Sequence, residues 1–218
     1  MPLTTVVFDL GAVLVDWDPR YAYRQMGGSE AEIEYFLSHV ATSEWNRQFD
    51  AGRPFAEGIA ERSAEFPEHA EWIEAWWSRW PDMLGGPIEG SVDVLRELRD
   101  ADVPLYALTD WSAETFPIAR ERFAFLSWFD GIVVSGEKGV TKPDPAIYAH
   151  LSTDFGVEPA ASVFIDDKPA NVNAARRLGF HGIDFVSPAD LRRRLTALGL
   201  PVSASAEAAT DGAMPLGT

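Results

Sequence analysis

Three apolar stretches of the chain each end in a polar side chain. Residues 4–8 lead to Asp9, residues 105–108 lead to Thr109, and residues 162–165 lead to Asp166 and Asp167. Short apolar runs of this kind are typical of strands that are buried on both faces of a parallel sheet. Open α/β sheets bind their ligands at the carboxyl ends of such strands, so the three polar ends are expected to converge on one site.

A strand pattern opens the chain, and helical and strand patterns alternate from residue 87 onward. Helices are predicted over 89–101, 145–155, 169–178 and 188–198, with another that starts late because of Pro117, and strands over 3–10, 103–108, 131–134, 162–165 and 182–186. This alternation predicts a parallel sheet with right-handed crossovers. The predicted fold class is α/β, with a Rossmann-like parallel sheet as the core.

Residues 17–83 show helical patterns and no convincing strand. Ser29 and Glu32 have the spacing of a capping box, which predicts a helix to about His39, and Pro54 and Pro67 suit helix starts. The block is too long for an ordinary crossover, so it predicts an inserted, all-helical cap subdomain. The predicted core is therefore 1–16 and 84–200 and the cap 17–83, and the Ala- and Ser-rich tail 201–218 is expected to be disordered.

Composition narrows the choice of partners and compartment. The chain has 218 residues, 46% of them hydrophobic, no cysteine and a net charge of −16. Such an acidic surface repels nucleic acid and anionic membranes, and the lack of cysteine excludes thiolate chemistry. With no apolar run of the ~20 residues that a membrane helix needs and no signal-peptide pattern, a cytoplasmic protein is expected.

Taken singly, the candidate site residues have ordinary structural explanations. Asp9, Thr109 and the Asp166-Asp167 pair could each cap a turn or a helix, and Lys142 could be a surface lysine. Taken together, they indicate a site for Mg²⁺ and phosphate. Adjacent carboxylates such as Asp166 and Asp167 repel each other unless a cation lies between them, and Mg²⁺ prefers a few carboxylates completed by water and phosphate oxygens.

Four segments of the sequence resemble, in order, the motifs of the haloacid dehalogenase-like hydrolase superfamily. They are Phe8-Asp9-Leu10-Gly11-Ala12-Val13-Leu14, Leu108-Thr109-Asp110-Trp111-Ser112, Lys142-Pro143-Asp144-Pro145 and Phe164-Ile165-Asp166-Asp167-Lys168-Pro169-Ala170-Asn171. The resemblance covers about residues 3–198. Within the superfamily the chain looks most like helical-cap phosphatases of the glucose-1-phosphate phosphatase-like branch.

The resemblance implies a role for each matched position. Asp9 would be the nucleophile that forms an aspartyl-phosphate. Thr109, Asp110 and Lys142 would surround the transferring phosphoryl group. Mg²⁺ would be held by the carboxylates of Asp9 and Asp167 and by the main-chain carbonyl of Gly11, with Asp166 contributing directly or through water. The implied partner is a small-molecule phosphate ester, such as a sugar phosphate, and the protein is expected to be a monomer or a homodimer.

Two positions depart from the family pattern. Many of these phosphatases carry a second aspartate where this chain has Gly11, and that group protonates the leaving alcohol. Asp16 is a candidate substitute, although it could simply cap the first turn of the cap. Asp110 stands where asparagine is usual, and an ionised carboxylate cannot donate a hydrogen bond as an amide can.

Three functions therefore stand beside one another. The first is a Mg²⁺-dependent phosphatase, the second a 2-haloacid dehalogenase with Asp9 attacking carbon, and the third a binding protein on a weakened catalytic scaffold. In the superfamily that this sequence resembles, the dehalogenases need no metal and generally lack the acidic pair. The presence of Asp166 and Asp167 therefore favours the phosphatase.

Aromatic residues are concentrated in the predicted cap. Trp72, Trp76, Trp77 and Trp80 recur at helical spacing, which predicts a helix core rather than a ligand platform. A few other residues could line the cleft below the cap: Trp17, Tyr21, Trp45 and Trp111, with Arg20 or Arg24 as a cationic contact.

Overall fold

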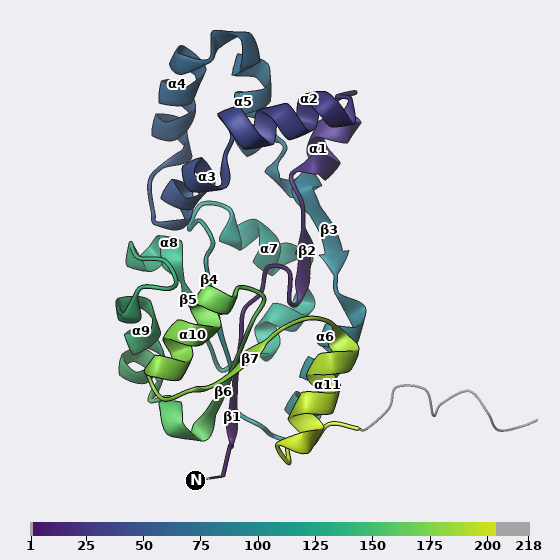
Figure 1. Cartoon of the computed structure of the whole chain (residues 1–218), viewed down its shortest axis with the longest axis vertical. Helices are drawn as coiled ribbons and strands as arrows, with labels where there is room; N and C mark the ends of the chain where they lie inside the picture. Colours follow the sequence, from purple (N-terminus) through teal and green to yellow (C-terminus); the bar gives the residue numbers. More distant parts are fainter. Residues whose placement is uncertain (1, 204–218) are drawn as a thin grey trace, which may run out of the picture.

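A computed structural model describes residues 2–203 (Figure 1). Its centre is a five-stranded sheet in the order β5-β4-β1-β6-β7, and every neighbouring pair is parallel. The strands are β1 (Thr5–Phe8), β4 (Leu105–Thr109), β5 (Gly131–Val134), β6 (Ser162–Asp166) and β7 (His181–Asp184). The predicted α/β class with a parallel sheet is confirmed.

Helices cover both faces of the sheet. Successive residues of a strand point to opposite faces, and in β1 Val6 and Phe8 join one hydrophobic cluster while Val7 joins the other. The first cluster includes α6 (Glu89–Asp100), α7 (Phe116–Arg122) and α11 (Pro188–Ala197), and the second includes α9 (Pro145–Phe155) and α10 (Pro169–Arg177). The result is a three-layer sandwich with the polar strand ends at one edge.

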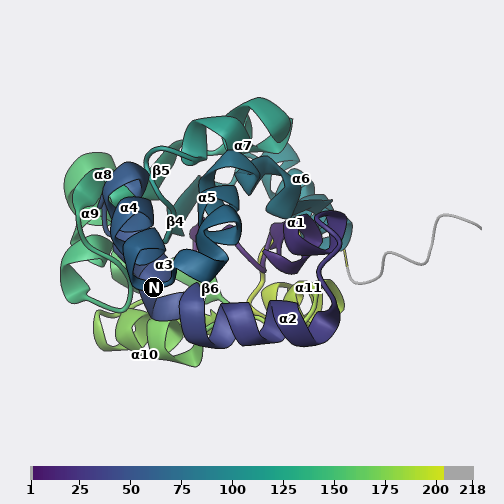
Figure 2. The same ribbon diagram turned by 90° about the horizontal axis from the view of Figure 1, so that it is seen from above.

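The helices between β1 and α6 lie beyond that edge. They are α1 (Arg20–Gln25), α2 (Glu30–Tyr35), which continues as a π-helical segment over Phe36–Val40, α3 (Ser43–Asp50), α4 (Phe55–Glu65) and α5 (Ala70–Ser78), with 3₁₀ turns at Pro67–His69 and Trp80–Met83. The capping box at Ser29 is present. Figures 1 and 2 show these helices above the carboxyl ends of the strands.

A two-stranded ribbon, which the sequence analysis missed, connects the helical block to the sheet. Strand β2 (Val15–Trp17) pairs antiparallel with β3 (Leu84–Pro87). The prediction assigned no strand here because β3 reads Leu-Gly-Gly-Pro, and glycine and proline are depleted in strands. The ribbon means that the chain leaves and re-enters the core at neighbouring points.

Three short segments lie between the longer elements of the core. Residues Ser135–Lys138 form the short helix α8, and Ala124–Trp128 and Pro159–Ala161 form 3₁₀ turns. Of the expected disordered tail 201–218, residues 204–218 lie outside the described residues. Val202 is buried and Ser203 bonds to Glu97, so the described start of that tail packs on the core. Over residues 2–203, no helix is both long and apolar enough to cross a membrane.

Candidate active site

The predicted convergence of the strand ends is present in the structure. β1 lies between β4 and β6, so Asp9, Thr109 and Asp166 stand side by side at the carboxyl edge of the sheet. Asp9 follows β1 directly, and its main-chain N–H donates to the carbonyl of Ile165 at 2.8 Å. Figure 1 shows this edge facing the helical block.

Lys142 binds the two acidic strand ends together. Its Nζ lies 2.9 Å from Oδ1 of Asp9 and 2.7 Å from Oδ2 of Asp166, and it donates to the carbonyl of Leu108 at 2.9 Å. The lysine and both carboxylates are almost completely inaccessible to solvent. We call Lys142, Asp9 and Asp166 the Lys142 cluster, and it connects β4, β1 and β6 through one cation.

The two members of the acidic pair have different surroundings. Asp166 accepts hydrogen bonds from Lys142, from the main-chain N–H of Lys168 at 2.8 Å and from Nδ2 of Asn171 at 3.0 and 3.1 Å. Asp167 is half-buried, and burial followed by the charge of Asp166 raises its pKa. Asp166 therefore acts mainly as the counter-ion that holds Lys142, whereas Asp167 has capacity for another ligand.

The nucleophile candidate has one engaged oxygen and one that is available. Oδ1 of Asp9 accepts from the main-chain N–H of Leu10 at 2.7 Å and contacts Lys142. Within residues 2–203, no donor reaches Oδ2 of Asp9 at hydrogen-bond distance. Lys142 and Leu10 thus fix the carboxylate while leaving an oxygen with which it can ligate or attack.

Charges in the cluster do not balance. Burial raises the pKa of Asp9 well above its ordinary value, Lys142 lowers it, and Asp166 and Asp110 raise it further. Burial lowers the pKa of Lys142, but the three aspartates outweigh this and raise it, so Lys142 remains charged. One cation faces several carboxylates, and a second cation would relieve the repulsion.

The donor set fits a small divalent cation. Asp9, Asp166 and Asp167 each offer a carboxylate oxygen, and these oxygens lie within 4.8 Å of one another. Carboxylate oxygens are the ligands that Mg²⁺ selects, and its preference for keeping water and phosphate oxygens suits a site with few protein ligands. The predicted carbonyl ligand at Gly11 stays a prediction.

Thr109 ends β4, Asp110 follows it, and the two side chains have different partners. The Thr109 hydroxyl is buried and has no partner among the described residues, which leaves its donor free for a bound oxyanion. Oδ1 of Asp110 accepts from the main-chain N–H of Lys142 at 2.9 Å. Asp110 therefore orients the loop that carries the lysine, an acceptor role that an asparagine carbonyl could also fill.

Gly11 leaves open space beside the nucleophile. A Cβ built on Gly11 would have no other atom within 4 Å. The proposed substitute, Asp16, lies in β2, where its Oδ2 accepts from the Tyr21 hydroxyl at 2.7 Å and packs against Gly85. Asp16 is thus engaged within the β2–β3 ribbon.

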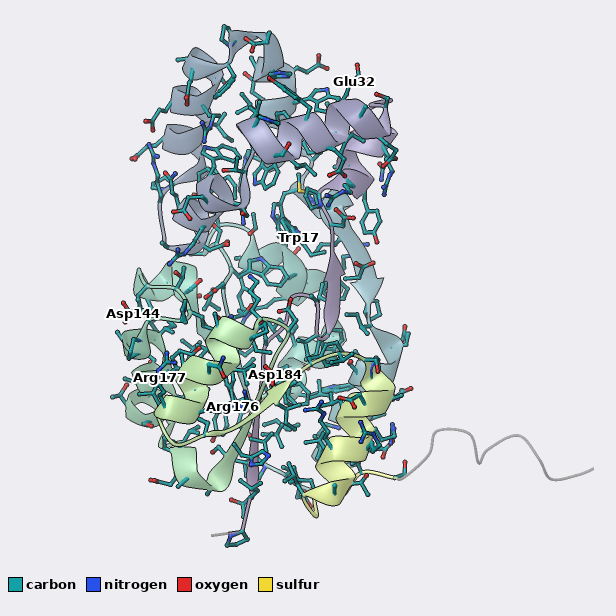
Figure 3. All side chains as sticks on the ribbon, viewed as in Figure 1. Trp17, Glu32, Asp144, Arg176, Arg177 and Asp184 are labelled. Atoms are coloured by element: carbon teal, nitrogen blue, oxygen red, sulfur yellow. The ribbon has the colours of Figure 1, made fainter. Side chains whose placement is uncertain are left out.

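The aromatic and cationic candidates of the helical block are mostly structural. Trp76 and Trp80 are buried, as the helix-core prediction required, and so is Trp45, but Trp72 is half-buried and Trp77 is 39% exposed, so the prediction holds for two of the four tryptophans. Trp17 packs edge-on against Trp76 between the helical block and the core (Figure 3). Arg20 pairs with Glu34 and Asp18, and Arg24 pairs with Glu30, so both have local acidic partners.

One residue near the site was missed by sequence reasoning. Asp50 is the last residue of α3, and its main-chain carbonyl accepts a hydrogen bond from Ser135 at 2.5 Å. The available signal was electrostatic, because a carboxylate at the C-terminus of a helix lies at the negative end of the helix dipole. We call the contact between Asp50–Gly52 and Ser135–Gly136 the α3–α8 junction.

Comparison with known proteins identifies the family to which the chain belongs. The family model described as "haloacid dehalogenase-like hydrolase" matches residues 3–179. The chain belongs to the haloacid dehalogenase-like hydrolase family, and it is an enzyme of the hydrolase class.

Individual relatives share less than a third of their aligned residues with this chain. The chain is 28% identical to the sesquiterpene phosphatase astK of Aspergillus oryzae, over 81% of this chain and 87% of the relative. It is 22% identical to a D-ribitol-5-phosphate phosphatase of Bacteroides thetaiotaomicron, over 90% of this chain and 98% of the relative.

A solved structure shares the fold. It is a family enzyme from Bacteroides thetaiotaomicron in complex with magnesium and inorganic phosphate, with a TM-score of 0.66 and 21% identity over 85% of this chain and 95% of the other. At this identity the likeness establishes the fold alone.

Proposed function

We propose that the protein is a Mg²⁺-dependent phosphatase that hydrolyses the phosphate monoester of a small metabolite. The observation that carries the proposal is the Lys142 cluster beside Asp167. It holds a buried carboxylate with one available oxygen next to acidic oxygens that need a second cation. Relatives whose names describe phosphatases of phosphorylated metabolites support the same reaction class.

The proposed reaction has two displacements at phosphorus. An oxygen of Asp9 attacks phosphorus, the bond from phosphorus to the ester oxygen breaks, and the alcohol leaves with a proton. Water then attacks the aspartyl-phosphate, the bond from phosphorus to Asp9 breaks, and phosphate leaves. Splitting one difficult step into two is the advantage of a covalent nucleophile.

The chain's own residues bind and orient the phosphoryl group. Lys142 contributes a fixed positive charge, and the Thr109 hydroxyl a hydrogen-bond donor. Asp9, Asp167 and Asp166 would hold Mg²⁺, with Gly11 contributing its carbonyl. When bound, the ion neutralises charge on the phosphoryl oxygens, which an acidic protein could otherwise not accommodate.

Substrate choice is proposed only as a class. The names of the two relatives describe an apolar terpenoid and a polar sugar alcohol. A test panel should therefore contain sugar phosphates, sugar-alcohol phosphates and isoprenyl phosphates, together with 2-chloropropionate for the dehalogenase alternative.

The first prediction concerns the nucleophile. Wild-type protein with Mg²⁺ should release phosphate from at least one ester of the panel, and EDTA should abolish this. Asp9→Asn should lose turnover completely, since an amide is a poor nucleophile, while Asp102→Asn, a matched change at an exposed turn, should not. Phosphate release by Asp9→Asn, or halide release that persists in EDTA, would contradict the proposal.

A further inference from the structure

The proposed reaction needs a proton donor that the first motif does not contain. An alcohol leaves efficiently from phosphorus only if its oxygen gains a proton, and a positioned acid contributes about 10²–10⁴-fold. The position two residues after Asp9 is a glycine with open space around it, and Asp16 is bonded to Tyr21. Neither position therefore offers a free carboxyl group to the leaving oxygen.

Asp50 is held at the phosphate-binding edge by its main chain. The main-chain N–H of Trp111 donates to Oγ of Ser135 at 2.9 Å, and the Ser135 hydroxyl donates to the carbonyl of Asp50 at 2.5 Å. Trp111 follows Thr109 and Asp110 directly. The loop that would bind the phosphoryl group and the end of α3 are thus joined through one serine hydroxyl.

Glycine contacts make this junction close. Gly52 has φ +93°, and a Cβ there would lie 2.9 Å from the carbonyl oxygen of Gly136. A Cβ on Gly136 would lie 2.4 Å from the main-chain nitrogen of Ala113 and 2.8 Å from the carbonyl oxygen of Trp111. Main chain therefore packs on main chain from the helical block through α8 to the loop after β4.

Two polar contacts flank the junction. Nε of Arg47 donates to Oγ1 of Thr141 at 3.2 Å, next to Lys142, and the main-chain N–H of Phe55 donates to Oε1 of Glu114 at 2.8 Å. The segment 47–55 is thus fastened to both loops that carry the proposed phosphate-binding residues.

The Asp50 carboxyl group has few partners of its own. Nδ2 of Asn46 donates to its Oδ2 at 3.0 Å. Burial raises its pKa to about 7, the charge of Asp110 on the loop after β4 raises it, and the charge of Lys168 on the loop after β6 lowers it. Both protonation states are therefore populated near neutral pH, as a group that alternately donates and accepts a proton requires.

We propose that Asp50 is the catalytic acid and base of this enzyme, supplied from the helical block in place of the carboxyl group that Gly11 lacks. This inference rests on the proposed phosphatase function. As Asp9 attacks, the ester oxygen departs and takes the proton of Asp50, which becomes a carboxylate. Asp50 then takes a proton from the water that attacks the aspartyl-phosphate, so the carboxyl group is regenerated.

The test compares two leaving groups in Asp50→Asn. Asparagine keeps the acceptor for Asn46 but cannot transfer the proton. Turnover of an alkyl phosphate, whose alcohol needs protonation, should fall by about 10²-fold or more, whereas turnover of p-nitrophenyl phosphate should change little, because that phenolate leaves unaided. Glu57→Gln, an exposed change on α4, is the matched control and should behave as wild type on both esters.

The pH profile supplies a second readout. With the alkyl ester, wild-type kcat/KM should fall as the pH rises through about 7, because the proton of Asp50 is lost. This fall in kcat/KM should be absent from the profile of Asp50→Asn on the alkyl ester. It should also be absent from the wild-type profile on the aryl ester, and that profile controls for ionisation of the substrate phosphate.

Gly11→Asp provides a rescue, since the side chain has room there. Gly11→Asp/Asp50→Asn should regain at least about tenfold on the alkyl ester, within the range of a positioned acid. Equal losses on both esters, no loss on either, or a folded double variant no more active than Asp50→Asn would each overturn the assignment of Asp50. Absence of turnover by wild-type protein on every ester would instead overturn the proposed function.

Discussion

The Lys142 cluster contains buried carboxylates and the α3–α8 junction contains a half-buried one, Asp50, and the two regions differ in what lies beside the carboxylates. In the cluster, Lys142 lies within 2.9 Å of two carboxylates, and its raised pKa keeps it charged. At the junction, Asp50 has an amide donor and no cation at hydrogen-bond distance among the described residues, and its pKa is about 7.

The difference separates binding from proton transfer. The excess negative charge of the cluster can be corrected by a metal ion, and the charge of Asp50 can be corrected by a proton. Core loops of fixed geometry suit the first task. The second task falls to the helical block, whose residue Asp50 is joined to the loop after β4 through Ser135.

Removing the positive charge of Lys142 should have the largest effect on stability and activity. Lys142→Met leaves Asp9 and Asp166 buried without their counter-ion, and breaking a buried pair in this way costs about 3–5 kcal/mol. We expect a loss of this size in the free energy of urea unfolding, measured in EDTA, and no detectable phosphatase turnover.

A double variant tests whether unpaired charge causes the loss of stability in Lys142→Met. Lys142→Met/Asp166→Asn removes one of the two stranded carboxylates and should recover part of the lost stability without recovering activity. A double variant less stable than Lys142→Met would show that the cost arises from packing rather than from unpaired charge.

Opening the junction should have an intermediate effect. Gly52→Ala adds a side chain at φ +93° against the carbonyl of Gly136, whereas Gly86→Ala, at φ +140° in β3, meets no atom within 4 Å. Both variants incur backbone strain of about 1–3 kcal/mol, but only Gly52→Ala also places a Cβ 2.9 Å from the carbonyl oxygen of Gly136. We expect kcat on an alkyl phosphate to fall about tenfold in Gly52→Ala alone, which corresponds to ~1.4 kcal/mol.

Hydrogen exchange provides the structural readout for this pair. Amides of α3 and α8 should exchange faster in Gly52→Ala than in Gly86→Ala. Equal exchange and equal kcat in the two variants would mean that contact at the junction does not matter for turnover.

Removing the charge between the two regions should have the smallest effect, and in the opposite direction. Asp110→Asn keeps an acceptor for the main-chain N–H of Lys142 but removes an anion near the phosphate. We expect kcat/KM at pH 6 to rise a few-fold, mainly through KM. Since the charge of Asp110 raises the pKa of Asp50, the limb in the alkyl-ester profile should also move to lower pH. An unchanged pH profile would mean that the charge of Asp110 does not affect the pKa of Asp50.

Local patterns predicted the core well. The runs that end at Asp9, Thr109 and Asp166 form neighbouring strands, because apolar runs bounded by turns specify buried parallel strands without help from distant residues. The acidic pair and Lys142 followed from the same patterns and from the family resemblance. The different roles of Asp166 and Asp167 could not be predicted from the sequence. The hydrogen bonds of Asp166 come from the amide of Asn171 and the main chain of Lys168, and these contacts exist only in the folded protein.

Tertiary contacts determine what sequence reasoning missed. Strand β3 exists because it pairs with β2, against the preferences of its glycines and proline. Asp50 looks like an ordinary end of a helix until α8 is placed against it. Asp16 was the nearer candidate along the chain, but the hydroxyl of Tyr21 holds it in the ribbon.

The pairing of β2 with β3 brings the two ends of the helical block together. Val15 faces Pro87 across the ribbon, so both ends of the inserted helices are anchored at one point outside the main sheet. A different insertion can be grafted between these two residues without altering any strand that carries Asp9, Thr109 or Asp166. Such an insertion would keep these strands in place, but it would lose the contact of Asp50 with Ser135 and with it the proposed proton donor.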